Sequence, residues 1–574
     1  MRTFIFVALT ASMLAGFDVK NAIEDAVSNG MLAITLPAGR HIVTDTVNIR
    51  GAKNITVDGQ GSTIVFSLAD LNKQGFKIDN SENIRLKNFS IDYDPLPFTQ
   101  GTITAMSDDG KSIDFRIHDG YPDYAGLFIV KRAYIFDAKT RRWKTGVADL
   151  YPREAKALTP RTGRIVLGTA EPNVTVGDLI AFTTRAGAAI NAYWANGLRI
   201  EDVTIYTAPS IAVIVRFPAG EDNYFRFNVL RGTRPAGASE DRLLSTGADA
   251  FNYAYSRRGP VLENCEFEFM GDDSVNLHGV TFPVFQKDDA RSFIALFRRD
   301  LIGLTNIIRA GDRLRMLRRE NFDILDEAHI VSIAHAPQVR EFTREEVKVF
   351  WPSMPDSKYA FMRITADKDI AMDDAAFFDV PAVAAENFII RNCRFRDHRG
   401  RGLRIMASKG IIENNIIERI SQSAIALGPE YEYWREAGWP DNVVIRGNTL
   451  RDNGWGRFAL MSDYFSPGAI SLGYRPEKAG LFPSAIRSIT IESNLIDGST
   501  ASAIHINAAR DVIIRGNRIK RSNNGDCRTT GSKYGLTAVY AVEVQNSVDV
   551  RVEGNQFKDP GAFCAGEIRG AGVK

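Results

Sequence analysis

Apolar and polar positions repeat in one pattern along much of the chain. Each copy has two or three apolar residues, a polar pair, then Cys or Asn, and a return to apolar residues. The copies are VLENCEF (261–267), IIRNCRF (389–395), IIENNII (411–417), VIRGNTL (444–450), TIESNLI (490–496), IIRGNRI (513–519) and VRVEGNQF (550–557). Two of the steps are 22 and 23 residues, and the others are longer. A period of roughly 20–25 residues predicts one coil of a β-solenoid, with insertions at some turns.

The Cys and Asn positions of this pattern form a single column. Its members are Cys265, Cys393, Asn415, Asn448, Asn494, Asn517 and Asn555. Asn tolerates the left-handed backbone conformation of a turn, and stacked Asn side chains can hydrogen-bond from coil to coil. We interpret Cys265 and Cys393 as small apolar members of the same stack.

Stretches before and between these copies complete the predicted architecture, an all-β parallel solenoid. The segments 82–91 and 196–205 are expected to be earlier coils without the Asn. The amphipathic stretch 18–27 is expected to be a helix that caps the first coil, because an open solenoid end would expose strand edges. The intervals 95–185 and 281–385 lack the pattern and contain short alternating strands, which predicts two inserted antiparallel, barrel-like β domains.

These features predict how the chain is divided. The expected parts are a cap with the first coils (17–94), an inserted domain (95–185), further coils (186–280), a second inserted domain (281–385) and C-terminal coils (386–574). Both inserted domains meet the solenoid near residues 271–279, so we expect them to wall a pocket there.

The N-terminal residues MRTFIFVALTASMLAGF have one basic residue before an apolar run. This pattern predicts a signal peptide, residues 1–16, and therefore an exported protein that is periplasmic or secreted. A buried first helix is the alternative. Phe17 stands where the lipidated Cys of a lipobox would be, so we expect no lipid anchor.

Composition removes several other classes of function. The net charge of the 574 residues is +2 with no basic block, so we expect no nucleic-acid partner. No later apolar run approaches the ~20 residues of a membrane span. The four cysteines form no CxxC pair, which argues against a zinc site. Cys527 and Cys564 are a candidate disulfide.

Residues 271–279, GDDSVNLHG, place two carboxylates side by side. Asp249-Ala-Phe-Asn, 24 residues before Asp273-Ser-Val-Asn, repeats the same pattern one coil earlier. The predicted column is Asp249, Asp273, Arg401 and Ser423. Since neighbouring strands lie ~4.8 Å apart, three carboxylates would be close enough to raise at least one pKa.

A neutral carboxylic acid beside ionised ones is what general acid/base catalysis requires. A calcium site would also use carboxylates, but arginines such as Arg399 and Arg401 oppose a cation there and would keep the other carboxylates charged. The third interpretation is that these carboxylates are solvated surface charges. The alternation of Val275 and Leu277 into a core argues against it.

Several ordered motifs carry a resemblance to a known family. GADAF followed by GDDSVNLHG resembles the three-aspartate set of right-handed β-helix glycosidases, polygalacturonases included. The match is closer to glycoside hydrolase family 110, the exo-acting α-1,3-galactosidases. The motifs that resemble it are 91–103, 241–251, 269–279, 396–405 and 430–449, and the resemblance covers about residues 30 to 520.

The resemblance implies inverting hydrolysis of terminal α-1,3-linked galactose, as on group B type glycans and on linear Gal-α-1,3-Gal, without metal or other cofactor. It implies Asp249, Asp272 and Asp273 as the catalytic residues. Pro429-Glu430 departs from the small residue and Asp expected there. Gly247-Ala248-Asp249 replaces the Asn-Thr-Asp of polygalacturonases, which argues against a pectin enzyme.

From these residues we expect Asp272 to be the general acid, with Asp249 and Asp273 holding the water, although the labels could be exchanged. Both adjacent carboxylates can serve only if the chain bends, which Gly271 permits. The candidate sugar-binding residues are Asn276, His278, Arg399, Arg401, Trp434 and Glu436. Trp434 could instead be loop core, Glu436 a surface charge and His278 a wall residue.

Two other functions stay open. One is another β-helix polysaccharide hydrolase, similar to a polygalacturonase. The other is a glycan-binding solenoid without catalysis. In each case the partner is a glycan, here one with terminal α-galactose, and the oligomeric state is open.

Overall fold

The computed structural model describes residues 17–125, 132–220, 222–337, 340–373, 376–456, 467–473, 485–528 and 535–570. The expected signal peptide, residues 1–16, lies outside this part of the chain. Within it, no helix is long and apolar enough to span a membrane.

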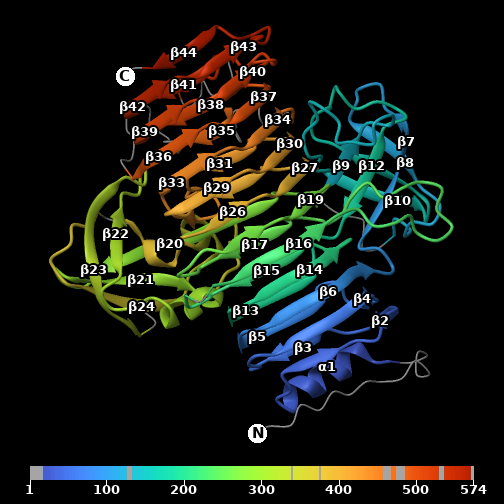
Figure 1. Cartoon of the computed structure of the whole chain (residues 1–574), viewed down its shortest axis with the longest axis horizontal. Coiled ribbons are helices and arrows are strands. Elements are labelled where there is room, and N and C mark those ends of the chain that lie inside the picture. The colour runs from blue at the N-terminus through green and yellow to red at the C-terminus, as the bar shows by residue number, and fades with distance from the viewer. Residues whose placement is uncertain are drawn as a thin grey trace.

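The chain forms a β-helix whose coils stack from the N-terminus to the C-terminus (Figure 1). Strands at equivalent positions of successive coils pair in parallel, for example β17 with β20 and β28 with β31. One long parallel sheet contains β1 (Ala33–Thr35), β2 (Arg40–Val43), β4 (Thr56–Phe66), β6 (Arg85–Tyr93), β14 (Arg199–Ile205), β16 (Tyr224–Val229), β18 (Val261–Glu263), β19 (Glu266–Glu268), β26 (Ile389–Arg391), β27 (Arg394–His398), β29 (Gly410–Glu413), β30 (Ile416–Ile420), β33 (Asp441–Arg446), β34 (Thr449–Asn453), β36 (Ile486–Glu492), β37 (Leu495–Ser499), β39 (Ala509–Arg515), β40 (Arg518–Lys520), β42 (Val548–Glu553) and β43 (Gln556–Lys558).

A second parallel sheet carries the candidate site. Its strands are β3 (Val47–Arg50), β5 (Phe76–Glu82), β13 (Ile190–Asn196), β15 (Val213–Arg216), β17 (Phe251–Ala254), β20 (Val275–Lys287), β28 (Leu403–Ile405), β31 (Ile425–Leu427), β35 (Gly468–Leu472), β38 (Ser502–Asn507), β41 (Tyr540–Gln545) and β44 (Gly566–Gly570). Helix α1 (Val19–Ser28) covers the first coil and buries Val19, Ile23 and Ala26 against it, as predicted.

Both inserted antiparallel domains are present, and they project from opposite sides of the solenoid (Figure 1). The first has the strand order β10-β11-β8-β7-β12-β9. Its strands are β7 (Phe98–Met106), β8 (Ser112–Ile117), β9 (Ala133–Phe136), β10 (Glu154–Thr159), β11 (Thr162–Val166) and β12 (Leu179–Thr183).

The second inserted domain is a closed ring of six strands, because β20 pairs with both β21 and β25. Its other elements are β21 (Ser292–Arg298), η2 (Arg299–Asn306), β22 (Arg313–Leu317), β23 (Ile324–His335), α2 (Arg344–Phe350), β24 (Tyr359–Ala366), β25 (Phe377–Asp379) and η3 (Pro381–Val383). β20 starts as a solenoid strand beside β17 and then enters the ring. It also pairs with β32 (Glu436–Ala437).

The predicted asparagine column forms a buried hydrogen-bonded ladder. Asn415 N and Nδ2 both donate to Asn448 Oδ1 at 3.0 Å. Asn448 donates in the same way to Asn494, and Asn494 to Asn517. Cys393 joins the column by donating its backbone N–H to Asn415 Oδ1 at 2.9 Å.

One detail of the ladder differs from the sequence-based expectation. The residue in the left-handed region is the one before the ladder residue, such as Asn414 (φ 57°) or Gly447 (φ 64°). That residue makes the turn, so the ladder Asn can point its side chain into the buried stack.

The candidate Cys527–Cys564 disulfide is not formed. Cys564 Sγ lies 3.3 Å from the carbonyl of Gly566, and Cys527 Sγ lies 3.8 Å from that of Thr500.

Replacing Asn448 with Ala should destabilise the solenoid. Asn448→Ala removes the acceptor of the buried Asn415 N–H and one of the donors to the Ile412 carbonyl, at 2.9 Å. At about 1–3 kcal/mol for a buried group that loses its partner, the free energy of unfolding should fall by about 1–3 kcal/mol, measurable by urea denaturation. Asn555→Ala is the control, because Asn555 is only half-buried near the end of the ladder. An equal loss in both variants would contradict the buried-ladder explanation.

Candidate active site

Two neighbouring coils place three carboxylates together. Asp249 lies two residues before β17, and Asp273 lies two residues before β20. The backbone N–H of Ala250 donates to the Asp273 carbonyl at 3.0 Å, so the two aspartates are in register. Asp249, Asp272 and Asp273 each offer one carboxylate oxygen within 4.8 Å of the others.

The next two coils continue this column as predicted. Ser274 N donates to the Arg401 carbonyl at 3.1 Å, and Gly402 N donates to the Ser423 carbonyl at 3.0 Å. Arg401 and Ser423 therefore follow Asp273 along the sheet.

Both adjacent aspartates reach the cluster because the chain bends before β20 begins. Residues 271–274 lie outside the strand, so the alternation of side chains along a strand does not apply to them. Gly271 lies so close to the preceding coil that a Cβ would be 2.4 Å from the Gly247 carbonyl oxygen. Glycine is therefore required at this bend.

Asp249 is the carboxyl group whose protonated form is favoured. Its side chain is buried, with the residue only 7% exposed. Burial raises the pKa of Asp249 well above its usual value, and the Asp272 and Asp273 charges raise it further. The hydrogen bond from Asn252 Nδ2 to Asp249 Oδ2, at 2.8 Å, only partly offsets this.

Asp272 has the opposite environment. Arg399 donates to Oδ1, and Arg185 Nη2 donates to Oδ2 at 2.9 Å. Burial raises the pKa of Asp272, but these two arginines outweigh it and hold the pKa well below its usual range. The charged form of Asp272 is therefore favoured, so this environment does not favour the role expected for Asp272 as the group that carries the proton.

The first inserted domain helps to hold these two arginines in place. Asp149 holds Arg399 with two contacts, 3.0 Å to Nε and 2.9 Å to Nη2. Tyr134 Oη accepts from Arg185 Nη2 at 3.0 Å. Arg399 thus lies between two carboxylates, where it orients Asp272.

The sequence analysis missed Asp149, Tyr134 and Arg185. No local signal marks them, because they reach Asp272 only through the packing of the inserted sheet on the solenoid. The general prediction that the inserts wall the site was the only available signal.

Two opposing effects act on the pKa of Asp273, namely burial and the neighbouring Arg401. Its Oδ1 accepts the Arg401 backbone N–H at 2.6 Å, and its Oδ2 lies 3.7 Å from Arg401 Nη1. Burial raises the pKa of Asp273, and the lowering effect of Arg401 does not fully offset it.

A polar wall adjoins the carboxylates and contains three of the predicted sugar-binding residues. Glu436 Oε1 lies 3.8 Å from His278 Nε2, and Glu436 Oε2 lies 3.2 Å from Arg404 Nη2. Burial lowers the pKa of His278 to about 4, so the ring is neutral. Its Nδ1–H faces the Gly279 carbonyl at 2.8 Å, which leaves Nε2 as an acceptor.

Asn276 belongs to the same wall. It pairs with Asn252 on β17 and with Arg404 on β28 and is 3% exposed. Its Oδ1 is buried and has no hydrogen-bond partner. An unsatisfied buried acceptor beside carboxylates fits a ligand hydroxyl.

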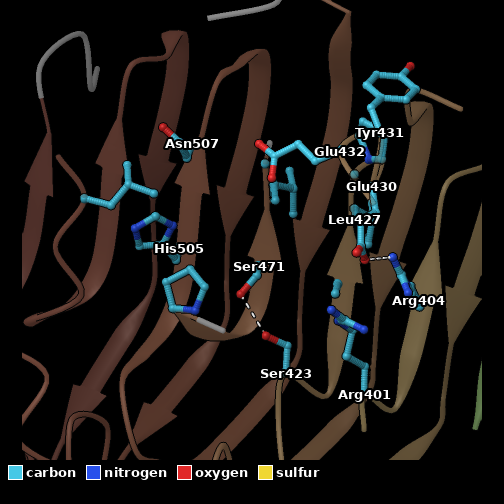
Figure 2. A pocket seen from close by; sticks show the side chains of 17 residues that line it. Arg401, Arg404, Ser423, Leu427, Glu430, Tyr431, Glu432, Ser471, His505 and Asn507 are labelled. Carbon is cyan, nitrogen blue, oxygen red and sulfur yellow. Dashed lines mark hydrogen bonds and ion pairs between the residues drawn. The ribbon is translucent and has the colours of Figure 1, made fainter. Parts of the chain in front are cut away.

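A pocket of about 110 Å³ borders the cluster on its C-terminal side. It includes Arg401 and Arg404 but not the three aspartates. In Figure 2, Glu430 pairs with Arg404 at one end, and His505 and Asn507 lie at the other. This pairing is the role of Glu430 at the position where the sequence departs from the resembled family.

Trp434 is not among the residues that line this pocket. It is 41% exposed and packs edge-on against Tyr433, with ring centroids 5.0 Å apart. It is therefore not loop core.

The three carboxylates are close enough to bind a cation, but their donor set fits one poorly. Arg399 and Arg185 already donate to both oxygens of Asp272. Calcium takes six to eight oxygen ligands, and two adjacent guanidinium charges would repel it.

Comparison with known proteins agrees with this fold. The family described as "Right handed beta helix region" matches residues 387–573. The chain is 26% identical over 418 residues to Alpha-1,3-galactosidase A of Shewanella woodyi, which covers 69% of this chain and 63% of that protein. It is 23% identical over 454 residues to Alpha-1,3-galactosidase B of Akkermansia muciniphila, covering 73% and 51%.

A third relative is covered more completely. The chain is 23% identical over 509 residues to Alpha-1,3-galactosidase B of Bacteroides fragilis, covering 83% of this chain and 79% of that protein. The chain spans between half and two thirds of the length of the first two relatives. The resemblance inferred from the sequence is confirmed: over most of its length the chain is similar to proteins named as α-1,3-galactosidases.

Replacing Asp249 with Asn should stabilise the protein as pH rises. The folded pKa is raised above the unfolded value of about 3.9, so the wild type loses stability as pH rises from there toward the folded pKa, by about 1.4 kcal/mol per unit. Asn does not titrate and can still accept from Asn252. The stability advantage of Asp249→Asn, measured by urea unfolding, should grow as the pH rises above about pH 4.

The matched control is the neighbouring Asp272→Asn. The pKa of Asp272 is depressed, so its charge stabilises the fold above the unfolded pKa, and this variant should be less stable than the wild type at pH 7. If both variants were more stable than the wild type at pH 7, or both less stable, the opposite environments of Asp249 and Asp272 would be contradicted.

Proposed function

We propose that the protein is an exo-acting, inverting glycoside hydrolase that removes terminal α-1,3-linked galactose from glycans. The observation that carries this proposal is the cluster of three carboxylates within 4.8 Å, in which neighbours favour a proton on Asp249 and a charge on Asp272. The names of the relatives supply the sugar and linkage. Export to the periplasm or the outside, by a signal peptide in residues 1–16, is part of the same proposal.

In this mechanism Asp249 is the general acid that protonates the leaving oxygen. Asp272 and Asp273 hold the attacking water, and Asp273 takes its proton. Asp272 and Asp249 thereby exchange the roles expected from the sequence. The reason is that Arg185 and Arg399 make the protonated form of Asp272 unfavourable.

The short separations support a shared water. Two oxygens that accept from one water at about 2.8 Å each lie about 4.4 Å apart. Separation alone is closer to a retaining pair, since retaining carboxyl groups lie about 5–5.5 Å apart and inverting ones about 6.5–9.5 Å apart. Inversion is favoured because both oxygens of Asp272 are occupied by arginines, which makes Asp272 a poor nucleophile.

Charge pairing favours a neutral sugar over a uronic acid. Arg399 and Arg185 face Asp272, Arg401 faces Asp273, and Arg404 faces two glutamates. The arginines beside Asp272 and Asp273 are therefore already compensated, which argues against a galacturonate carboxylate at these positions. Arg216, next to Asn252, donates to amide oxygens, so a uronic acid at that position is the alternative that the product test must exclude.

The carboxylate cluster also argues against a glycan-binding solenoid without catalysis. Three close carboxylates repel one another, and burial of Asp249 and Asp273 adds to that cost. Recognition of a neutral sugar needs hydroxyl and amide partners but does not need such a cluster.

The stereochemistry of the first product tests the reaction. We expect NMR of the wild type acting on Gal-α-1,3-Gal and on its fucosylated, group B type form to show β-galactose first. Initial α-galactose would mean retention. No galactose from either glycan, or degradation of oligogalacturonate instead, would overturn the proposed substrate.

The acid is identified by its dependence on the leaving group. Asp249→Asn should lower kcat/KM for the disaccharide by about 10²–10⁴-fold, because protonation of the leaving oxygen is lost. An aryl α-galactoside with a strongly acidic phenol needs little protonation of its leaving oxygen. For this substrate, Asp249→Asn should therefore lower kcat/KM much less. Asp273→Asn should lower kcat/KM for the disaccharide and for the aryl galactoside by similar factors. If Asp272→Asn instead shows the selective loss, the acid is Asp272.

A further inference from the structure

We propose that the pocket on the C-terminal side of the carboxylates is a subsite for the leaving group, which binds the neutral hexose next to the terminal galactose. This inference rests on the proposed function. It adds the direction in which the glycan lies along the solenoid.

The hollow is built by small residues between large ones in one row of the sheet. Strand pairing places Arg404, Ala426, Ser471 and His505 side by side on β28, β31, β35 and β38. Three strand steps of about 4.8 Å separate the outer two, about 14 Å in all. The methyl and hydroxymethyl groups between them leave room for a sugar ring.

Two glycines extend this hollow toward the ends of the strands. Gly428 and Gly473 have φ of 140° and 150°. A Cβ on Gly428 would lie 2.1 Å from the Gly473 carbonyl oxygen, and one on Gly473 would lie 2.6 Å from that of Asn507. Glycine is therefore required at both positions, and neither adds a side chain to the pocket.

The lining suits a neutral ligand with hydroxyl groups. Figure 2 shows Ser423 and Ser471 between the two ends of the pocket, joined by a 2.9 Å hydrogen bond. Two arginines, Arg401 and Arg404, are matched there by two glutamates, Glu430 and Glu432. Burial lowers the pKa of the fifth candidate charge, His505, which favours its neutral form.

The position of the terminal sugar sets the direction. The orphan Asn276 Oδ1 and the adjoining wall lie beside the aspartates, so the terminal sugar belongs there. The pocket begins on the next strand, at Arg404. In the same row, two strands from Asn276 in the other direction, Ile214 presents a branched apolar side chain.

This symmetry gives a matched pair of variants. Ala426→Phe fills the hollow two strands beyond Asn276, and Ile214→Phe enlarges the equivalent position on the opposite side. Ala426→Leu is a milder filling that guards against misfolding. Thermal unfolding checks that each variant is folded.

The readout compares substrates that differ only in the leaving group. The first is α-galactosyl fluoride, which has no leaving sugar. The second is a trisaccharide that extends Gal-α-1,3-Gal by one neutral hexose at its reducing end. We expect Ala426→Phe to lower the ratio of trisaccharide to fluoride kcat/KM by about tenfold or more, and Ala426→Leu to lower it less. Ile214→Phe should leave the ratio at its wild-type value.

An unchanged ratio in Ala426→Phe, or a collapse in Ile214→Phe alone, would overturn the proposal. Calorimetric binding of the corresponding leaving disaccharide supplies a test that does not depend on turnover. Ala426→Phe should weaken the binding of this disaccharide at least tenfold, and Ile214→Phe should leave its binding unchanged. If the wild type hydrolyses the fluoride yet binds no disaccharide, the subsite is wrong. If it binds the disaccharide at this pocket but hydrolyses no galactoside, the subsite stands and the proposed reaction fails.

Discussion

The parallel stacking of coils in register is the constraint on which the rest of this structure depends. It brings residues at equivalent positions about 4.8 Å apart, whatever their chemistry. For asparagine this spacing gives a favourable ladder, in which each amide both donates and accepts. For aspartate the same spacing forces like charges together, as with Asp249 and Asp273. The fold thus creates the site by repeating a polar residue where repetition is electrostatically unfavourable.

Groups from outside the repeat relieve this repulsion unevenly. Arg185 and Arg399 are directed at Asp272, and Asp149 of the first inserted sheet holds Arg399 in place. Among the described residues, Asp249 receives an amide hydrogen bond at one oxygen and none from an arginine. Because compensation reaches one carboxylate more than another, the charged form is favoured on Asp272 and the protonated form on Asp249. This division is what acid/base chemistry uses.

The repeat itself could be predicted from the sequence, because stacking converts spacing along the chain into contact in space. The column of Asp249, Asp273, Arg401 and Ser423 followed from aligning coils, and strand pairing reproduces it. The left-handed turn was assigned one residue too late, since hydropathy alone does not distinguish the ladder Asn from the residue before it. Asp149 could not be found this way. It belongs to an inserted sheet, whose packing on the solenoid has no periodic signal.

The choice of the acid could not be predicted from the repeat for the same reason. Spacing predicted that one carboxyl group would be neutral, but the choice among three depends on which is reached by arginines. Arg399 belongs to a solenoid coil, directly after β27, whereas Arg185 lies where the first insert joins the solenoid. Electrostatic roles in this site therefore depend on the insertion as well as on the repeat, which sets which residues can interact. A β-helix can keep one carboxylate column and redistribute its protons by changing what packs against one edge.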